Sequence, residues 1–432
     1  MLLDKHWNHL GKRKIPSPMV LIHFIADIFR TGKIEEILSF VVWEFMHRLR
    51  LFKKSSYLVI NEKLINVTIE DLLKQDELVF DVSQHSKIKI ETPTVSWHIL
   101  CFDPDGNIWG STIADKNILF FQAKGKKDST KVFEFPGTIR AIYISGQGVI
   151  FVCSKGKLYR SEAKAGSTSF ECVLSFLADD SIFRHNNTFT ETPGGFLLIG
   201  EYVIIWKSNR WVFGAILYSS DDSGKTWEKS EFLRQADVNK HIHLVRYSPA
   251  LKKLILTEGD NHKRIWVKKD DLFSHKSVDN LANWKTFTKH HIQMGGYTAM
   301  AEVNKKIVFG SDYMGGTNFV VTTEDLEKYK RKIIPDPWRR GWITNMIVTR
   351  DNKIWATSMY MYSSKNRSIL MFSQDEGETW NKVLDYDGTK YLVDIISSSI
   401  KNQDTLYIKI REYDKADNQL HITKAISCIG KA

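Results

Sequence analysis

The spacing of apolar residues along the chain changes near residue 56. Before that point, apolar side chains recur every three or four residues, which is typical of amphipathic helices. They are Leu21, Phe24, Ile25, Ile28 and Phe29, followed by Ile34, Ile37, Leu38, Val41 and Val42. After it, short apolar runs are separated by turns rich in Gly, Asp and Asn, which is typical of β-strands. The pattern predicts a helical segment over residues 1–56 and a β-domain over residues 57–432.

The β-rich part contains a repeated unit of apolar run, polar turn, second apolar run, loop and third run. Seven units align on the second run, with steps of 41 to 58 residues, at Ile108, Val149, Phe196, Leu254, Ile307, Ile354 and Leu406. Units of this length with four strands each are typical of propeller blades. We therefore predict an all-β fold, a seven-bladed β-propeller. Its last blade ends too near Ala432 to hold an outer strand, so residues 57–90 are expected to supply one.

Two turns of the β-domain share the pattern S-x-D-x-G-x-T-W, at Ser220–Trp227 and Ser373–Trp380. The aspartates, Asp222 and Asp375, can accept hydrogen bonds from backbone N–H groups of the turn, and each glycine can adopt a positive φ. The tryptophan can pack against the blade. The pattern resembles the Asp-box, or BNR repeat, of sialidase-like propellers, and both copies follow a third strand. The resemblance implies that these turns are scaffold and not catalytic.

The charge of the chain favours acidic partners. Its 61 Lys and Arg residues against 50 Asp and Glu give a formal net charge of +11. Such a charge suits an anionic glycan, an anionic lipid or nucleic acid. The resemblance links the fold to glycans, so we predict an anionic oligo- or polysaccharide and expect no nucleic acid. Four Cys without a CxxC pair and no visible secretory signal favour a cytoplasmic location.

Basic clusters flank the helical segment, at Gly11–Lys14 and His47–Lys54. One interpretation is an amphipathic anchor on the anionic inner face of a membrane, which would make the protein peripheral to that membrane. The other is a pair of helices that pack on the β-domain with their Lys and Arg side chains in water. The apolar runs are too short and too interrupted to span a bilayer.

The fourth repeat unit has the densest group of candidate chemical residues. His241 and His243 are expected on one side of a strand, and Glu258 and Asp260 end the strand that returns beside it. Two His and a carboxylate could bind Zn²⁺ or Mn²⁺, although no cofactor is favoured. They could also act as a general base with an orienting carboxylate that raises one imidazole pKa, or simply line the mouth of the propeller.

The third unit resembles the opening segment of sialidases, in which an Arg before the first strand binds the substrate carboxylate and an acidic residue follows on the next strand. Arg184 and Glu201 occupy those places, and Tyr202 follows Glu201. The sialidase proline after the Arg is replaced here by Asn186. Asp312 and Arg340 enter the same predicted mouth from later units and are further candidates for substrate binding.

Together these features predict a carbohydrate-active propeller that acts on an anionic glycan, as a glycoside hydrolase or a polysaccharide lyase. The predicted catalytic residues are His241, His243, Glu258, Tyr202 and Glu201, and the predicted substrate-binding residues are Arg184, Asp260, Asp312 and Arg340. The alternative is a non-catalytic glycan-binding or polysaccharide-assembly propeller that the N-terminal helices attach peripherally to a membrane.

Overall fold

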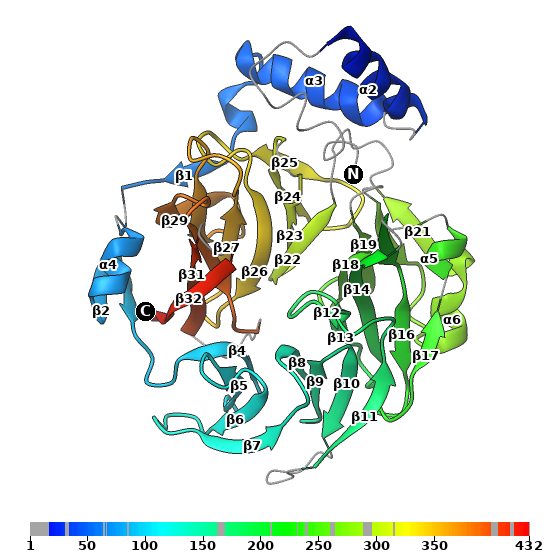
Figure 1. Ribbon diagram of the computed structural model, residues 1–432, viewed down its shortest axis with the longest axis vertical. Helices are drawn as coiled ribbons and strands as arrows, with labels where there is room; N and C mark the ends of the chain where they lie inside the picture. The colour runs from blue at the N-terminus through cyan, green and yellow to red at the C-terminus, as the bar shows by residue number, and fades with distance from the viewer. Residues whose placement is uncertain are drawn as a thin grey trace.

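The computed structural model describes residues 17–431, except 31–33, 64, 66, 84–85, 162–168, 208–209, 231, 237, 239–240, 260–263, 288–295, 314–315, 399–404 and 415–418. The described strands form seven sheets. Figure 1 shows the sheets arranged around a common centre, with the chain passing from one sheet to the next. This arrangement is that of a β-propeller, as the repeats predict.

Four sheets come from the first part of the ring. The first and second sheets consist of β4 (Trp97–Phe102), β5 (Ile108–Thr112), β6 (Ile118–Gln122) and β7 (Thr130–Glu134), and of β8 (Ile139–Ile144), β9 (Ile150–Ser154), β10 (Lys157–Ser161) and β11 (Phe170–Ser175). The third sheet consists of β12 (Ile182–Phe183), β13 (Phe189–Glu191), β14 (Leu197–Lys207), β15 (Arg210–Gly214), β16 (Leu217–Ser220) and β17 (Glu228–Ser230). The fourth sheet consists of β18 (Ile242–Ser248), β19 (Lys253–Glu258), β20 (Ile265–Lys268) and β21 (Trp284–Phe287). Within each sheet, neighbouring strands are antiparallel.

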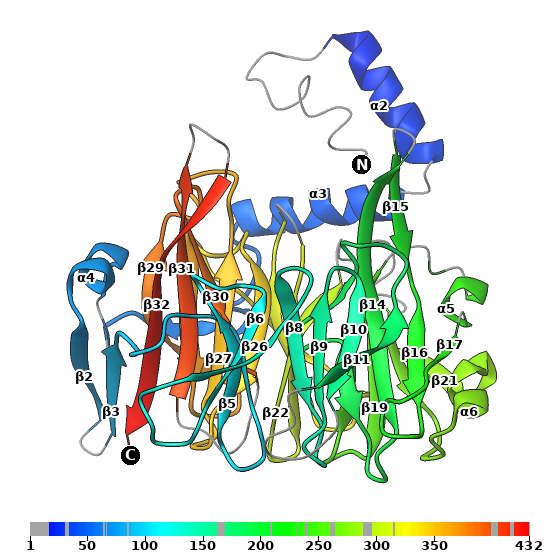
Figure 2. The same cartoon turned by 60° about the horizontal axis from the view of Figure 1, so that its bottom comes forward.

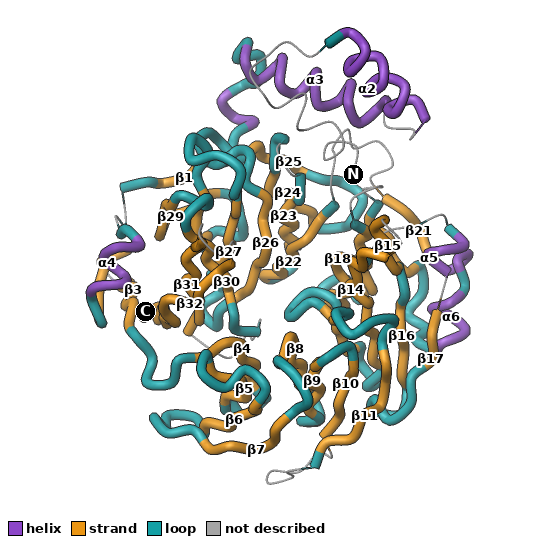
Figure 3. The backbone as a smooth tube through the Cα atoms, viewed as in Figure 1, coloured by secondary structure: helices purple, strands orange, loops and turns teal. Residues whose placement is uncertain are grey.

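Three further sheets follow along the chain. The fifth consists of β22 (Tyr297–Val303), β23 (Lys306–Ser311), β24 (Phe319–Thr323) and β25 (Lys330–Ile333). The sixth consists of β26 (Trp342–Val348), β27 (Ile354–Met359), β28 (Ser368–Ser373), β29 (Thr379–Tyr386) and β1 (Val59–Asn61), and the seventh of β30 (Tyr391–Ile395), β31 (Thr405–Asp414), β32 (Gln419–Lys431), β3 (Ser86–Glu91) and β2 (Glu77–Ser83). Short helices α4 (Ile69–Lys74), α5 (Phe232–Gln235) and α6 (His275–Asp279) lie at the rim, as Figure 3 shows.

The N-terminal strands complete the last two sheets. β3 pairs antiparallel with β32, which confirms that residues 57–90 supply an outer strand to the last unit. β1 also adds to the preceding sheet, where it runs parallel to β29, and the sequence did not predict this pairing. The backbone N–H of Leu100 in β4 donates to the carbonyl of Ile396 at 3.1 Å, so the first and last sheets are in contact.

The core lies between neighbouring sheets because their inner strands are buried on both faces. All seven residues of β22 are buried, and so are all five of β24. Leu244 and Ile255 of one sheet belong to the same apolar cluster as Tyr297 and Phe309 of the next. Strands covered on both faces read as nearly continuous apolar runs, which is why the repeats were visible in the sequence.

The two repeated turns have the hydrogen bonds expected of them. The Asp222 carboxylate accepts from the backbone N–H groups of Lys225 and Thr226, both at 3.0 Å, and Asp375 accepts from Thr379 at 2.9 Å. Burial opposes ionisation, but these hydrogen bonds lower the Asp222 pKa to about 2. The intervening glycines, Gly224 and Gly377, have φ of 79° and 88°. The turns therefore act as structural connections between third and fourth strands.

A β-bulge recurs near the start of the innermost strands. In five described sheets, the pairing of the first strand with the second shifts around one residue. The displaced residues are His98, Arg140, His243, Thr298 and Thr344. A bulge re-aims the side chain that it displaces and commonly lies next to a functional site. All five residues lie where the chain enters a sheet, on the face that we call the mouth.

Two N-terminal helices, α2 (Pro18–Arg30) and α3 (Ile34–Arg48), lie at the outer edge of the ring next to β25, as Figure 1 shows. In Figure 2, α2 extends away from the sheets. The Glu44 carboxylate of α3 accepts hydrogen bonds from Arg339 at 2.6 Å and from Arg340 at 2.8 Å. Trp43 packs edge-on against Phe319 with ring centroids 5.0 Å apart. Within the described ranges, no helix has both the length and the apolar character needed to cross a bilayer.

Candidate functional site

A central cavity of about 220 Å³ opens among the innermost strands. Three non-adjacent parts of the chain line it: the segment around β12 and β13, the start of β26, and β30. The lining residues are Ile182, Arg184, His185, Asn187, Thr344, Asn345, Asp394 and Ile395. Six of these eight side chains are polar, so the cavity suits a hydrophilic ligand better than an apolar one.

Several polar atoms of this lining have no hydrogen-bond partner among the described residues. They are His185 Nε2, Asn187 Oδ1 and Asn345 Oδ1, and all three atoms are buried. Burial lowers the His185 pKa to about 4, so its imidazole is neutral at pH 7. Its Nδ1 lies 3.2 Å from the carbonyl oxygen of Ile142. Buried polar atoms normally have a partner, so these three atoms are unsatisfied groups beside the cavity.

The cavity is bordered by cations. Arg184 donates from Nη2 to the carbonyl of Thr344 at 3.3 Å. Asp394 is bound by Arg411, with an Nη2–Oδ2 distance of 2.6 Å. Lys409 pairs across the strands with Asp394, and its Nζ lies 3.2 Å from the His98 carbonyl oxygen. Burial and nearby Arg411, Lys116 and Arg140 lower the Lys409 pKa to about 8, despite the opposing effect of Asp394.

Arg184 also connects the cavity to the predicted histidine pair. Its Cζ lies 5.4 Å from the centroid of the Tyr202 ring, in a cation–π arrangement. The Tyr202 ring centroid is 4.2 Å from that of His241 and 6.3 Å from that of His243. The structure therefore brings together four of the residues that the sequence singled out, from two neighbouring sheets.

The two imidazoles are hydrogen-bonded to each other. The Nε2 atoms of His241 and His243 are 2.8 Å apart, and both side chains are buried. One nitrogen must donate and the other accept, so at least one ring is neutral. Gly259 permits the close approach of the next strand, because a Cβ there would lie 2.8 Å from His243 Nε2. The pair is thus held in one buried arrangement.

The expected rise in an imidazole pKa is wrong for His243. Burial lowers its pKa well below the usual value, and the charges of His241 and Arg184 lower it further. His243 is therefore a neutral base at pH 7. Within the part of the chain that the structure describes, no group of three or more His, Cys, Asp or Glu side chains could hold a metal ion.

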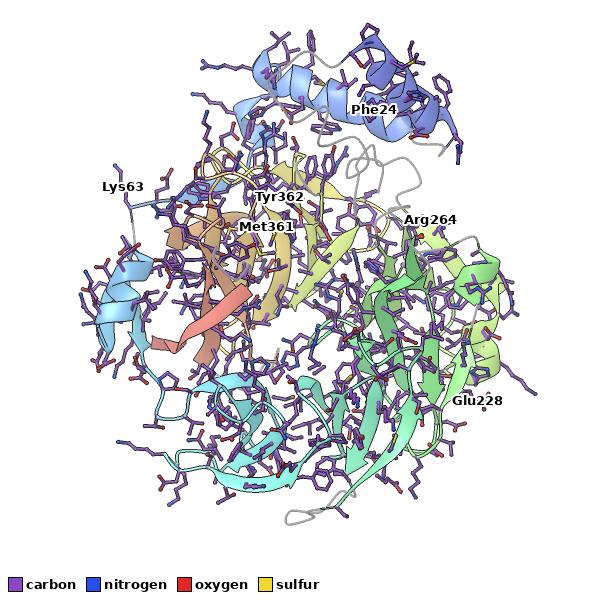
Figure 4. The ribbon with its side chains drawn as sticks, in the orientation of Figure 1. Phe24, Lys63, Glu228, Arg264, Met361 and Tyr362 are labelled. Atoms are coloured by element: carbon purple, nitrogen blue, oxygen red, sulfur yellow. The ribbon has the colours of Figure 1, made fainter. Side chains whose placement is uncertain are left out.

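Glu258 does not orient either histidine by a hydrogen bond that the structure describes. It lies opposite Ile242 in the strand pairing, and its carboxylate accepts from Arg264 Nη2 at 3.2 Å and from Trp266 Nε1 at 3.1 Å. Figure 4 places Arg264 toward the rim of the ring, away from its centre. We predicted Glu258 beside the histidines because the sequence does not reveal the β-bulge at His243, which determines which residues share a face of the strand.

Glu201 also faces away from the cluster. It is fully buried and accepts hydrogen bonds from the Tyr218 hydroxyl at 2.8 Å and from the Leu177 backbone N–H at 2.9 Å. Adjacent residues of a strand point to opposite sides, so Glu201 and Tyr202 are separated in this way. Glu201 therefore connects β16 of its own sheet to the segment between β11 and β12, and its carboxylate is already bound.

The remaining predicted substrate-binding residues do not gather at the cavity. Arg340 is bound by Glu44 of α3. Asp312 follows β23 and is half-buried, and its backbone N–H donates to the Gly296 carbonyl at 2.8 Å. Asp260 lies outside the described residues. Of the three predicted substrate contacts that the structure describes, Arg184 lines the cavity, and Asp312 and Arg340 do not.

Sequence reasoning missed Asn187, Asn345 and Asp394. Asn187 and His185 lie within three residues of Arg184, so the segment entering the third unit carried a usable signal. Asn345 and Asp394 come from the sixth and seventh units, at similar places in their innermost strands. Comparing residues at the same place in every unit would have found them.

Comparison with known proteins supports the fold. No protein-family model matches the chain, and no curated protein is a significant match. A solved streptogramin B lyase shares 12% identity with a TM-score of 0.50, covering 79% of this chain and 97% of the lyase. A catalytically inactive virginiamycin B lyase from Staphylococcus aureus, solved with quinupristin, shares 13% identity with a TM-score of 0.53, covering 80% and 99%. At this identity the similarity establishes a β-propeller fold and nothing of its chemistry.

Proposed function

We propose that the chain is a closed, seven-bladed propeller that binds an anionic saccharide in its central cavity. The observation that carries this proposal is the cavity of about 220 Å³, whose lining combines Arg184 with amide, imidazole and hydroxyl side chains. Arg184 suits a carboxylate, because a guanidinium can bind it through two parallel hydrogen bonds. The buried amide oxygens suit the hydroxyl groups of a sugar.

The size of the cavity supports a single sugar unit. Pockets for drug-sized ligands are about 300–1,000 Å³, and this cavity is smaller. A longer oligo- or polysaccharide would therefore place one acidic unit in the cavity and the rest over the mouth. Tyr202, whose ring lies beside Arg184, offers an aromatic surface for such a neighbouring unit.

A second candidate function is β-elimination from a uronic acid. It is favoured by the neutral His243 beside His241, Tyr202 and Arg184. The imidazole would take the proton from C5, the C4–O4 bond would break, and the leaving oxygen would gain a proton from a general acid such as Tyr202. Hydrolysis by a Tyr and carboxylate pair is less well supported, because Glu201 is bound to Tyr218 and Leu177.

The turn geometry supports kinship with Asp-box propellers. Both aspartates accept hydrogen bonds from the backbone of their turns, and both tryptophans donate from Nε1 to a glycine carbonyl, at 3.1 and 3.2 Å. Under this proposal the turns on the face opposite the mouth stabilise the sheets. The inner strands and their bulges supply the ligand contacts.

Calorimetric titration with oligosaccharides rich in uronic acid, against neutral oligosaccharides of equal length, tests the binding proposal. Arg184→Gln should weaken binding of the acidic ligand by about 10- to 100-fold, the range for losing a charged hydrogen bond. Arg367→Gln is the matched control, because Arg367 pairs with Asp385 away from the cavity. Equal affinity for neutral ligands, or no effect of Arg184→Gln, would contradict the proposal. Ultraviolet absorbance of an unsaturated product distinguishes a lyase from a binding protein.

A further inference from the structure

The N-terminal helices expose apolar side chains at helical spacing. On α2 these are Met19, Leu21, Ile22, Ile25 and Phe29, and on α3 they are Leu38, Val41, Val42 and Phe45. Phe29 is 66% exposed and Phe45 is 59% exposed. Leu49 and Leu51 continue the exposed apolar surface after α3. We call these eleven residues the apolar surface.

The opposite faces of the helices are the ones that the protein itself covers. Ile28 of α2 is buried. On α3, Glu44 binds Arg339 and Arg340, and Trp43 stacks on Phe52 with ring centroids 5.0 Å apart. α3 therefore turns its acidic and aromatic side toward the sheets and its aliphatic side outward. That is the reverse of a helix whose apolar face closes a core.

The charged residues around the apolar surface are mainly basic. Arg30, Arg48, Arg50, Lys53 and Lys54 are all exposed. Among the acidic side chains described on these helices, Glu44 is buried against two arginines and Asp27 is half-buried. An apolar surface rimmed by exposed cations matches a bilayer that has an apolar interior and anionic headgroups.

We propose that the apolar surface docks on an anionic lipid bilayer, with both helices inserted at its interface. A second copy of the chain is a poorer occupant, because face-to-face pairing would bring two sets of these cations together. Neither helix crosses the bilayer, since α2 has 13 residues and α3 has 15, against the roughly 20 that a span requires. The docking is therefore peripheral and does not depend on the saccharide proposal.

Docking by this surface also orients the propeller. α3 lies at the outer edge of the ring and binds Arg339 and Arg340, where the chain enters β26 from the mouth face. Met361 and Tyr362, in the loop after β27 on the same face, are 41% and 52% exposed. Figure 4 shows both of them on the side of the ring that carries the helices. A bilayer in contact with the apolar surface would thus lie toward this edge of the ring.

Flotation of the full-length protein with vesicles tests the inference. The probe is a vesicle of phosphatidylcholine with about one third phosphatidylglycerol, an anionic lipid, and the comparison is a vesicle of phosphatidylcholine alone. The wild type should bind the anionic vesicles at least tenfold more tightly, and added salt should weaken this binding. The triple variant Ile22→Glu, Phe29→Glu, Phe45→Glu should lose at least tenfold in binding.

The matched control is Leu272→Glu, because Leu272 is an equally exposed leucine in the sheet region. It should bind as the wild type does. The single variant Phe29→Glu, together with circular dichroism, separates lost docking from lost folding. The inference is overturned if the triple variant floats like the wild type, or if the wild type ignores anionic lipid. It is also overturned if the wild type is a dimer in solution that these substitutions dissociate, because a second copy then covers the surface.

Discussion

Two groups of cations on the mouth face differ in one respect. Arg339 and Arg340 lie under α3, and both bind the carboxylate of Glu44. Although burial raises the Glu44 pKa, the hydrogen bonds and charges of these arginines hold it below its usual value. Arg184 and Lys409 lie beside the central cavity, where the nearby carboxylate of Asp394 is already bound by Arg411. One group is neutralised by the chain itself, and the other is not.

The difference shows how to tell a structural arginine from a ligand-binding one. Burying a guanidinium costs free energy that a paired carboxylate offsets, so Glu44 makes the arginines under α3 part of the fold. Burial is the largest cause of the lowered Lys409 pKa, and the opposing charge of Asp394 offsets it only in part. An anion from outside could offset the rest. The sequence gives no reason to treat Arg184 and Arg340 differently. The contact of Glu44 with Arg340 is what distinguishes the structural arginine from the one at the cavity.

The largest expected effect comes from removing Glu44. Glu44→Ala leaves two arginines without their carboxylate and should destabilise the docking of α3 by about 3–5 kcal/mol, as for other broken buried pairs. Hydrogen–deuterium exchange over residues 34–48 measures this. Glu62→Ala is the control, because Glu62 makes an exposed ion pair at 3.8 Å with Lys382 and should cost at most about 1 kcal/mol. Equal exchange in both variants would remove the distinction between the two groups of cations.

Removing the charge of Lys409 should have a smaller effect of opposite sign. Its pKa is about 8 in the folded protein and about 10.5 when unfolded, so the unfolded chain binds the proton more tightly. Lys409→Met should therefore raise the free energy of unfolding by up to about 3 kcal/mol at pH 7. The gain should shrink as pH rises from 8 toward 10.5, because the folded wild type then releases the proton while the unfolded chain still holds it. Urea unfolding at several pH values measures it.

The control for Lys409→Met is Lys157→Met, since Lys157 is exposed at the start of β10. Its free energy of unfolding should not change with pH relative to the wild type. If Lys409→Met destabilises the protein at pH 7, the cation at the cavity is already compensated and the contrast with Arg339 and Arg340 fails.

Substitutions on the face opposite the mouth should have the smallest effect on either group of cations. Asp222→Ala and Asp375→Ala each remove a charged acceptor of turn N–H groups and should cost about 1–3 kcal/mol of global stability. Saccharide affinity and α3 exchange should stay as in the wild type, because the turns lie away from the mouth. Thermal unfolding and calorimetry check the two parts. Lost affinity with an unchanged melting temperature would show that the turns reach the site.

Much of the fold was predictable because it depends on local pattern. Buried strands give continuous apolar runs, and turns such as Ser220–Trp227 carry residues whose conformational needs are specific. The outer strand contributed by residues 57–90 followed from a count of strands in the last unit. The parallel pairing of β1 with β29 was not predictable, because nothing in three residues at a sheet edge specifies a partner.

The site was only partly predictable because it depends on register and on distant contacts. Arg184, Tyr202, His241 and His243 meet as their positions in the repeat suggested. Glu258 and Glu201 were misplaced because a bulge and the alternation of strand faces turn their carboxylates toward other partners. The contact between Glu44 and Arg340 joins residues 296 positions apart, and no local pattern encodes it.

The pairing of the N-terminal strands has a consequence for synthesis. Asn61 of β1 meets Asn381 of β29, which lies 320 residues later in the chain. Ribosomes add about 5–20 residues per second, so β1 waits on the order of tens of seconds for its partner. β3 pairs with β2 early, but its other edge waits longer still, since its partner β32 lies beyond β29 in the chain. β1 and this edge of β3 thus stay without their partner strands while the sheets between them are made, and during that interval they are the part of the nascent chain most in need of a chaperone.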